Sequence, residues 1–161
     1  TNITDNKILF QSNVVPRFNY EYELEIPKLE WKIEQEINEI LGYNVQKATV
    51  AYGGRNWIAW FTPEIPIQYG PYVFNGLPGL IVKLHDDKNN FTFLLNAIDK
   101  TEKDIYKSIY NNVTKTNKEK YMNVEKDFHD RPDLYFDSSS VRGAEIKSDY
   151  KLPYNPIEVN D

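Results

Sequence analysis

The stretch Tyr69 to Leu84, which reads YGPYVFNGLPGLIVKL, decides the fold more than any other part of this sequence. Its apolar side chains are interleaved with three glycines and two prolines. Proline fixes φ and lacks a backbone donor, whereas glycine adopts φ > 0 and lets other groups approach its backbone closely. The stretch therefore predicts a shaped loop, buried against a core, that leads into a strand from Leu80 onward.

The length and charge of the chain limit the kinds of protein that it can be. A chain of 161 residues predicts one domain, residues 1–161, that can bury a core without disulfides or a structural metal. The net charge is −5 and no basic residues cluster, so nucleic acid is not an expected partner. No apolar run is long enough for a transmembrane segment. The sequence begins at Thr1 without a methionine, so we expect either that a leader has been removed or that the numbering begins inside a longer chain.

The absence of cysteine excludes several kinds of site at once. Disulfides, thiolate zinc sites, iron–sulfur clusters and cysteine nucleophiles all need a residue that this chain lacks. No pattern of nucleophile, base or phosphate-binding glycines is present either. We therefore expect no cofactor, no metal and no identifiable catalytic residue.

Alternating apolar residues, many of them aromatic, predict several strands, and one stretch with apolar residues at helical spacing predicts a single helix. Strands are expected within 16–26 and 30–36, although the second stretch also fits a helical stripe through residues 29–40. Two hairpins are expected, one joining 45–52 to 57–62 across residues 53–56 and one joining 80–84 to 91–98 across residues 85–90. A helix is expected over 117–130 with Thr116 or Asn117 as its N-cap, and an edge strand over 152–159. The predicted fold class is α+β, mainly antiparallel β, with a curved sheet or open barrel and one helix covering its mouth or an edge.

Arg55 and nearby aromatic residues are the candidate ligand-binding residues. Arg55 follows Gly53 and Gly54, where its guanidinium could bind a carboxylate or phosphate of a ligand. The more conservative interpretation is an internal clamp that ties the hairpin tip to backbone carbonyls or to Glu64. The aromatic candidates are Trp57, Trp60, Tyr69 and Tyr72, which together with Phe61 and Phe74 would line a groove for sugars or peptides. Because one face of each strand must be core, at most half of these rings can meet a ligand, and core is the favoured interpretation.

The two histidines of the chain are weaker candidates. His85 precedes Asp86 and Asp87 in a predicted turn, where neighbouring side chains rarely converge on one ion. His129 lies at the predicted C-terminal end of the helix, where a histidine also suits the helix dipole. Surface positions without a role are the favoured interpretation for both.

The hexapeptide Gly76 to Ile81, GLPGLI, resembles the signature of the GLPGLI family of Bacteroidetes proteins. Other stretches resemble that family in the same order: 40–43, 46–49, 54–55, 59–62, 64–66, 70–72, Phe74 and 155–158. Together they span roughly two thirds of the chain, which is far more specific than a short motif. Val45 departs from the pattern, because many relatives have a cysteine there.

The resemblance implies an exported protein of the periplasm or cell envelope, with its signal peptide removed and with no established activity. It also implies a β-rich, bowl-like domain, similar to an accessory domain of a bacterial glycan-releasing amidase. The leading hypothesis is a non-catalytic binding or scaffold domain for a small hydrophobic, glycan or peptide ligand, or for an envelope protein. The alternatives are a hydrolase that uses carboxylates with one histidine and a structural domain that binds proteins through a strand edge.

Overall fold

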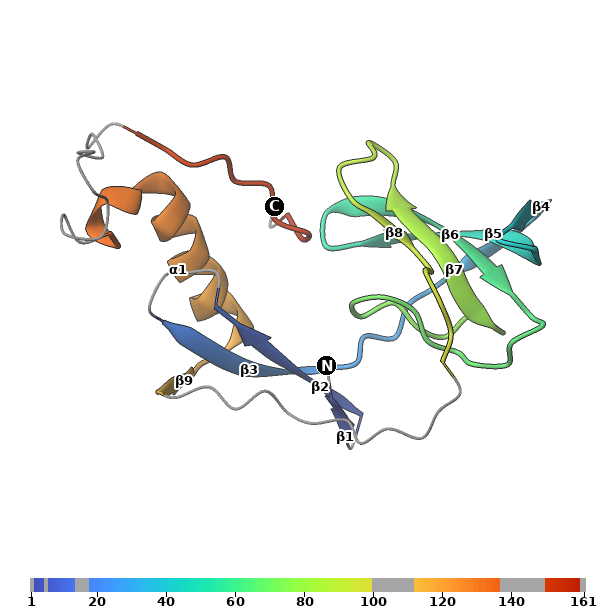
Figure 1. The fold of residues 1–161 in the computed structure, drawn as a ribbon, viewed down its shortest axis with the longest axis horizontal. Coiled ribbons are helices and arrows are strands. Elements are labelled where there is room, and N and C mark those ends of the chain that lie inside the picture. Colours follow the sequence, from blue (N-terminus) through green and yellow to red (C-terminus); the bar gives the residue numbers. More distant parts are fainter. Residues whose placement is uncertain (1, 5, 14–17, 100–111, 137–149, 160–161) are drawn as a thin grey trace. The chain divides into compact units, whose positions relative to one another are not determined.

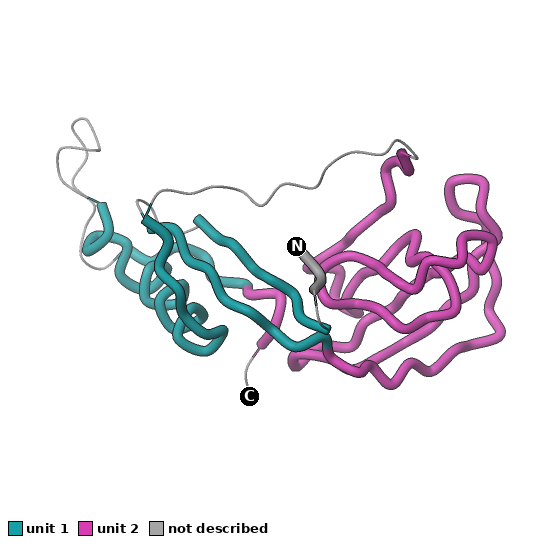
Figure 2. The backbone as a smooth tube through the Cα atoms, turned by 90° about the horizontal axis from the view of Figure 1, so that it is seen from below, with its two compact units in different colours: residues 1–26, 104–155 teal, residues 27–103, 156–161 magenta. Residues whose placement is uncertain are grey.

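The computed structural model describes residues 2–4, 6–13, 18–99, 112–136 and 150–159 of the chain (Figure 1). The chain divides into two compact units, shown in different colours in Figure 2. One unit holds Thr1–Ile26 and Asp104–Asn155, and the other holds Pro27–Lys103 and Pro156–Asp161. Each unit has its own β-sheet. The prediction of a single domain over residues 1–161 stays a prediction.

The first unit is built on a four-stranded sheet in the order β1-β2-β3-β9. Its strands are β1 (Asn2–Thr4), β2 (Lys7–Ser12), β3 (Asn19–Glu25) and β9 (Val113–Lys115). All pairs are antiparallel except β3 with β9, which is parallel. Strand β3 confirms the alternating strand expected within 16–26, and it ends just before Pro27, which cannot donate to a ladder.

The helix α1 (Lys118–Asp130) confirms the helix expected in the sequence, and it is followed by the short 3₁₀ helix η1 (Pro132–Leu134). The side chain of Asn117 accepts a hydrogen bond from the backbone N–H of Lys120 at 2.9 Å, so Asn117 is the N-cap. The ring of Tyr121 lies 5.8 Å from that of Tyr20 and 5.4 Å from that of Tyr22. Tyr20 and Tyr22 are two residues apart on β3, so their side chains point to the same face of the sheet. The helix α1 therefore covers a face of this sheet, whereas we expected it to cover a mouth or an edge.

The second unit is built on a five-stranded antiparallel sheet with the strands in chain order. The strands are β4 (Lys32–Ile40), β5 (Tyr43–Tyr52), β6 (Arg55–Thr62), β7 (Leu80–Asp86) and β8 (Thr92–Leu94). In the described part of the chain both sheets are open, and β4 and β8 are the edges of the second. The fold class is thus α+β, mainly antiparallel β, with one α-helix among the described residues.

Several element boundaries differ from those expected. Strand β4 runs to Ile40 rather than ending at Glu36, and a register shift between Ile33 and Ile37 lets the longer strand stay paired with β5. The β5–β6 turn has only two residues, Gly53 and Gly54, with φ of +57° and +69°, which suits a tight hairpin. Strand β7 includes two residues expected in the turn, and β8 stops at residue 94.

The edge strand expected over 152–159 is wrong. The described residues of that segment form no strand, and its two prolines cannot donate to a ladder. Among the described residues, one backbone hydrogen bond joins the end of this segment to the β5–β6 turn, from the N–H of Val159 to the carbonyl of Gly53 at 2.8 Å.

The Gly- and Pro-rich stretch forms the shaped loop predicted for it and packs against the core of the second unit. Phe74 and Leu77 are each only 1% exposed, and the ring of Phe74 lies 4.7 Å from that of the fully buried Trp57. The loop is held by backbone bonds, including one from the N–H of Leu80 to the carbonyl of Ile65 at 3.0 Å. Gly79 passes so close to β6 that a Cβ there would lie 2.1 Å from the carbonyl oxygen of Thr62.

Alanine substitutions at the last two glycines of this loop should therefore differ in their effect. Gly79→Ala drives a methyl group into the β6 backbone, so we expect a loss of about 3 kcal/mol in the free energy of unfolding. Gly76→Ala is the matched control, because a Cβ there meets nothing within 4 Å and only the φ of +88° opposes it. That strain should cost about 1 kcal/mol. Urea denaturation of both variants checks the difference, and equal losses would contradict the close approach.

Candidate functional site

Arg55 lies at the start of β6 with its guanidinium buried in the protein. Its Nη1 donates to Asp86 Oδ2 at 3.1 Å, its Nε donates to the carbonyl of Ile157 at 3.1 Å and its Nη2 donates to the carbonyl of Pro156 at 2.8 Å. The ring of Phe91 lies under the guanidinium, 5.0 Å away. This arrangement is the internal clamp considered from the sequence, although its carboxylate partner is Asp86 and not Glu64. A role of Arg55 in ligand binding stays a prediction.

Asp86 is the fully buried acid at the end of β7. Its Oδ1 accepts a hydrogen bond from the N–H of Phe91 at 2.8 Å, and its Oδ2 accepts one from the side chain of Asn90 at 3.1 Å. Burial by itself raises the pKa of Asp86, but these two hydrogen bonds and the charge of Arg55 outweigh it and lower the pKa below its ordinary value. The carboxylate is therefore ionised and locked into the fold.

The histidines do not assemble a site with these acids. The ring Nδ1 of His85 lies 3.1 Å from the backbone oxygen of Asp86, while Asp87 accepts a hydrogen bond from Asn56. His129 lies in the other unit, with its Nδ1 2.8 Å from the backbone oxygen of Glu125. Among the described residues, no three His, Cys, Asp or Glu side chains converge as metal ligands would.

The four aromatic candidates do not form one groove. Trp57 is fully buried and donates its ring N–H to the carbonyl of Tyr52 at 3.1 Å. Trp60 points to the opposite face of the sheet, where it is 8% exposed and packs with Val45 and Val82. Both tryptophans therefore contribute to the core. Tyr69 is 49% exposed, and Tyr72, which is treated below, is partly buried.

The end of the chain is anchored to the β5–β6 turn. We call residues Pro156 to Val159 the strap. Glu158 is only 6% exposed, and its Oε1 accepts hydrogen bonds from the hydroxyls of Tyr72 at 2.6 Å and Tyr52 at 3.1 Å. Sequence reasoning missed the strap, because its partners are about a hundred positions away in the chain.

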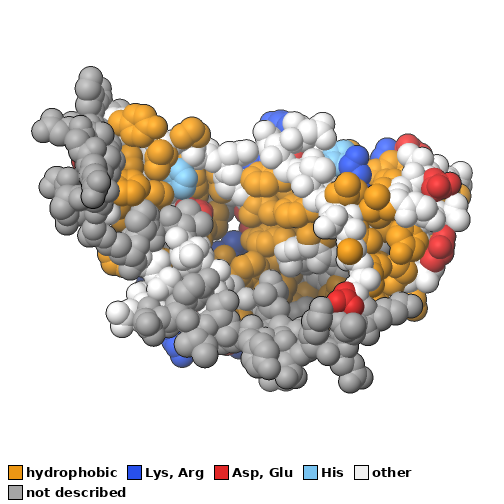
Figure 3. Space-filling view, in the orientation of Figure 1, with side chains coloured by type: hydrophobic (Ala, Val, Ile, Leu, Met, Phe, Trp, Pro, Cys, Tyr) orange, Lys and Arg blue, Asp and Glu red, His pale blue; other side chains and the backbone are white. Residues whose placement is uncertain are grey.

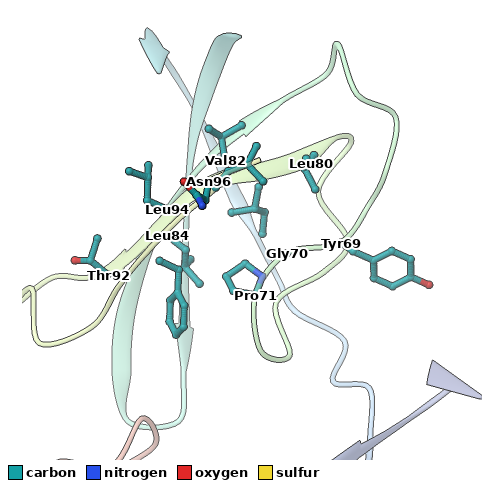
Figure 4. A pocket seen from close by; sticks show the side chains of 12 residues that line it. Tyr69, Gly70, Pro71, Leu80, Val82, Leu84, Thr92, Leu94 and Asn96 are labelled. Carbon is teal, nitrogen blue, oxygen red and sulfur yellow. The ribbon is translucent and has the colours of Figure 1, made fainter. Parts of the chain in front are cut away.

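A pocket of about 530 Å³ opens between β7, β8 and the beginning of the Gly- and Pro-rich loop (Figure 4). It is lined by Tyr69, Gly70, Pro71, Leu80, Ile81, Val82, Leu84, Thr92, Phe93, Leu94, Leu95 and Asn96. Hydrophobic side chains gather over β7 and β8 in the space-filling view (Figure 3). None of the lining residues is Asp, Glu, Lys, Arg or His.

Only one of the residues proposed from the sequence to bind a ligand lines this pocket. Tyr69 lies at its rim, and the ring points away from Pro71 and Leu84 (Figure 4). The other lining residues come from the beginning of the Gly- and Pro-rich loop, from β7 and β8, and from the two residues after β8. In the sequence, β7 and β8 gave no sign of a site beyond their apolar residues. A run of apolar residues predicts a buried core strand as well as the lining of a pocket, so the sequence alone could not distinguish a strand from a pocket lining here.

No described helix is long and apolar enough to cross a membrane. A family model described as a protein of unknown function (Porph_ging) matches residues 54–83, which hold all of β6, the Gly- and Pro-rich loop and the beginning of β7. No curated protein matches the sequence of the chain significantly.

The chain is similar in fold to a solved structure of PNGF-II. In a P21 crystal form the TM-score is 0.50 with 21% identity, over 74% of this chain and 22% of PNGF-II. For a C2 crystal form the TM-score is 0.48 with 19% identity, over the same shares of the two chains. The chain thus spans about a fifth of the length of PNGF-II, and at this identity the likeness concerns the fold alone.

The buried pair of Arg55 and Asp86 predicts a specific pH dependence of stability. Folding lowers the pKa of Asp86, so the ionised side chain adds to the free energy of unfolding at any pH above its pKa in the unfolded chain, about 3.9. This stabilisation is lost as the pH falls from that value toward the lower pKa of the folded protein. Asp86→Asn leaves the charge of Arg55 uncompensated, so we expect a loss of about 3 kcal/mol at neutral pH. Denaturant unfolding of both proteins between pH 7 and pH 2 should show their free energies of unfolding converging below pH 4. A constant difference over this range would contradict the assignment.

Proposed function

We propose that this chain is a non-catalytic binding domain whose pocket beside β8 holds an apolar ligand. We further propose that it is a member of the GLPGLI family and acts in the periplasm or cell envelope. The match of the Porph_ging model to residues 54–83 is compatible with this family, since those residues include the GLPGLI hexapeptide. Cell fractionation with an antibody against the chain tests the location, and recovery of the protein in the cytoplasm would contradict it.

The pocket is the observation that carries the proposal. Its volume of about 530 Å³ lies within the range of about 300–1,000 Å³ that is typical of ligand sites. Thr92 and Asn96 contribute the only polar side chains of the lining besides Tyr69. A sugar would leave several hydroxyls without partners against such a lining, and burying them unpaired is unfavourable. Among the hydrophobic, glycan and peptide ligands expected from the sequence, the lining therefore favours a hydrophobic one.

The hydrolase alternative finds no support among the described residues. General acid–base catalysis needs a carboxylate or histidine within reach of the substrate, and the lining of the pocket has neither. The buried carboxylate of Asp86 is already bound by Arg55, Asn90 and Phe91. Its role in the fold accounts for its burial.

Protein binding through a strand edge remains a second candidate function, and one observation favours it. On the edge strand β4, Ile33 is 47% exposed and Ile37 is 70% exposed. Exposed apolar side chains on an edge strand suit an added strand from a partner. A dimer in solution that Ile37→Lys abolishes would support this function.

The pocket is tested by binding of N-phenyl-1-naphthylamine, an uncharged fluorescent probe. We expect saturable binding to the wild-type chain and an affinity at least about tenfold lower for Leu94→Lys, because a charged group then replaces part of the apolar lining. Leu41→Lys is the matched control, since it makes the same change at an equally exposed leucine that does not line the pocket. Equal binding by the two variants, or no binding by the wild type, would contradict a ligand site in this pocket.

A further inference from the structure

The strap contacts the protein as a bound peptide does. Its residues follow Asn155, which belongs to the other unit, and they lie beside the β5–β6 turn at the red end of the chain in Figure 1. The surface that holds it consists of Tyr52, Gly53, Gly54, Arg55 and Tyr72, which we call the strap site. All five residues belong to the second unit and lie more than 80 positions before the strap.

Part of the strap site recognises backbone and not side chains. Arg55 donates to two successive carbonyls, those of Pro156 and Ile157, and Gly53 accepts from the N–H of Val159. Successive carbonyls and a nearby N–H are present in any extended peptide, so these contacts provide general peptide affinity.

The rest of the strap site contacts the side chain of Glu158. The two phenol hydroxyls of Tyr52 and Tyr72 converge on the buried carboxylate of Glu158, and hydrogen bonds to an ionised group are among the strong ones. The turn makes room for this residue, since a Cβ at Gly53 would lie 2.6 Å from Cγ of Glu158. The site is therefore shaped for one residue type at one position of the peptide.

The hydrogen bonds described above between the strap and the strap site are ones that a separate peptide could make. The strap has one backbone hydrogen bond to the turn and no ladder among the described residues. The preceding segment is instead tied to the other unit, where the N–H of Leu152 donates to the carbonyl of His129 at 2.8 Å. Identical segments can exchange between copies of one chain at little cost, because the exchanged contacts are the same.

We propose that the strap site is a peptide-binding site that accepts the Pro-Ile-Glu-Val segment of a second copy of this chain. Within one chain the strap is present at high effective concentration and occupies its own site for most of the time. Exchange between copies then occurs at high protein concentration or when the intramolecular strap is weakened. The strap site shares no residue with the lining of the apolar pocket, so this proposal does not depend on the ligand of that pocket.

A labelled peptide with the sequence of residues 152–161, LPYNPIEVND, tests the proposal by fluorescence anisotropy. The full chain with Glu158→Ala loses both phenol bonds of its own strap, so its strap site should be open to the peptide. We expect saturable binding to this variant and at least about tenfold weaker apparent binding to the wild-type chain, whose own strap competes. A control peptide with alanine in place of the glutamate should bind the variant at least about tenfold more weakly than the native sequence.

Binding with this preference supports the proposal. Failure of the native peptide to bind a variant that keeps the circular dichroism of the wild type overturns it, as does equal affinity for the two peptides. If Glu158→Ala does not fold, Glu158→Gln replaces it in the same experiment, because glutamine retains the shape of the side chain without its charge. Failure of the native peptide to bind, or equal affinity for the two peptides, then overturns the proposal in the same way.

Discussion

The hydrogen-bonded ion pair of Arg55 and Asp86 is the interaction on which the second unit depends. A buried ion pair is favourable only when further hydrogen bonds satisfy both groups. Here the acid also accepts from Asn90 and Phe91, and the guanidinium also donates to two carbonyls of the strap. One pair of charges thereby links the beginning of β6, the β7–β8 turn and the end of the chain, three segments that are far apart in sequence.

This constraint also bears on function. An arginine that follows two glycines suggests a ligand site when it is read from the sequence, but in the structure the guanidinium of Arg55 is bound to Asp86 and to two backbone carbonyls of the same chain. Trp57 and Trp60 are likewise buried on opposite faces of the sheet. A pocket of about 530 Å³ lies beside β8, and its lining has no charged side chain. Arg55 and Asp86 do not line this pocket, so their cluster of polar contacts and the apolar pocket are separate features of the second unit.

Local patterns were sufficient to predict much of the fold. Alternation predicted β3, the glycine pair predicted the β5–β6 hairpin, and an N-cap with a following proline bounded α1. Long-range effects were not predictable in the same way. The strap depends on contacts across about a hundred residues, and the register shift between Ile33 and Ile37 depends on the neighbouring strand. The pocket was missed because its apolar residues have the same pattern as a buried strand.

The most direct test of the account is amide hydrogen exchange of the full chain with Arg55→Lys. Lysine keeps the charge opposite Asp86 but cannot donate to two carbonyls and a carboxylate with the geometry of a guanidinium. If Arg55 holds the three segments together, exchange should become faster in residues 53–57, 86–91 and 156–159 at the same time. Faster exchange confined to residues beside position 55, with the strap as protected as in the wild type, would contradict the account.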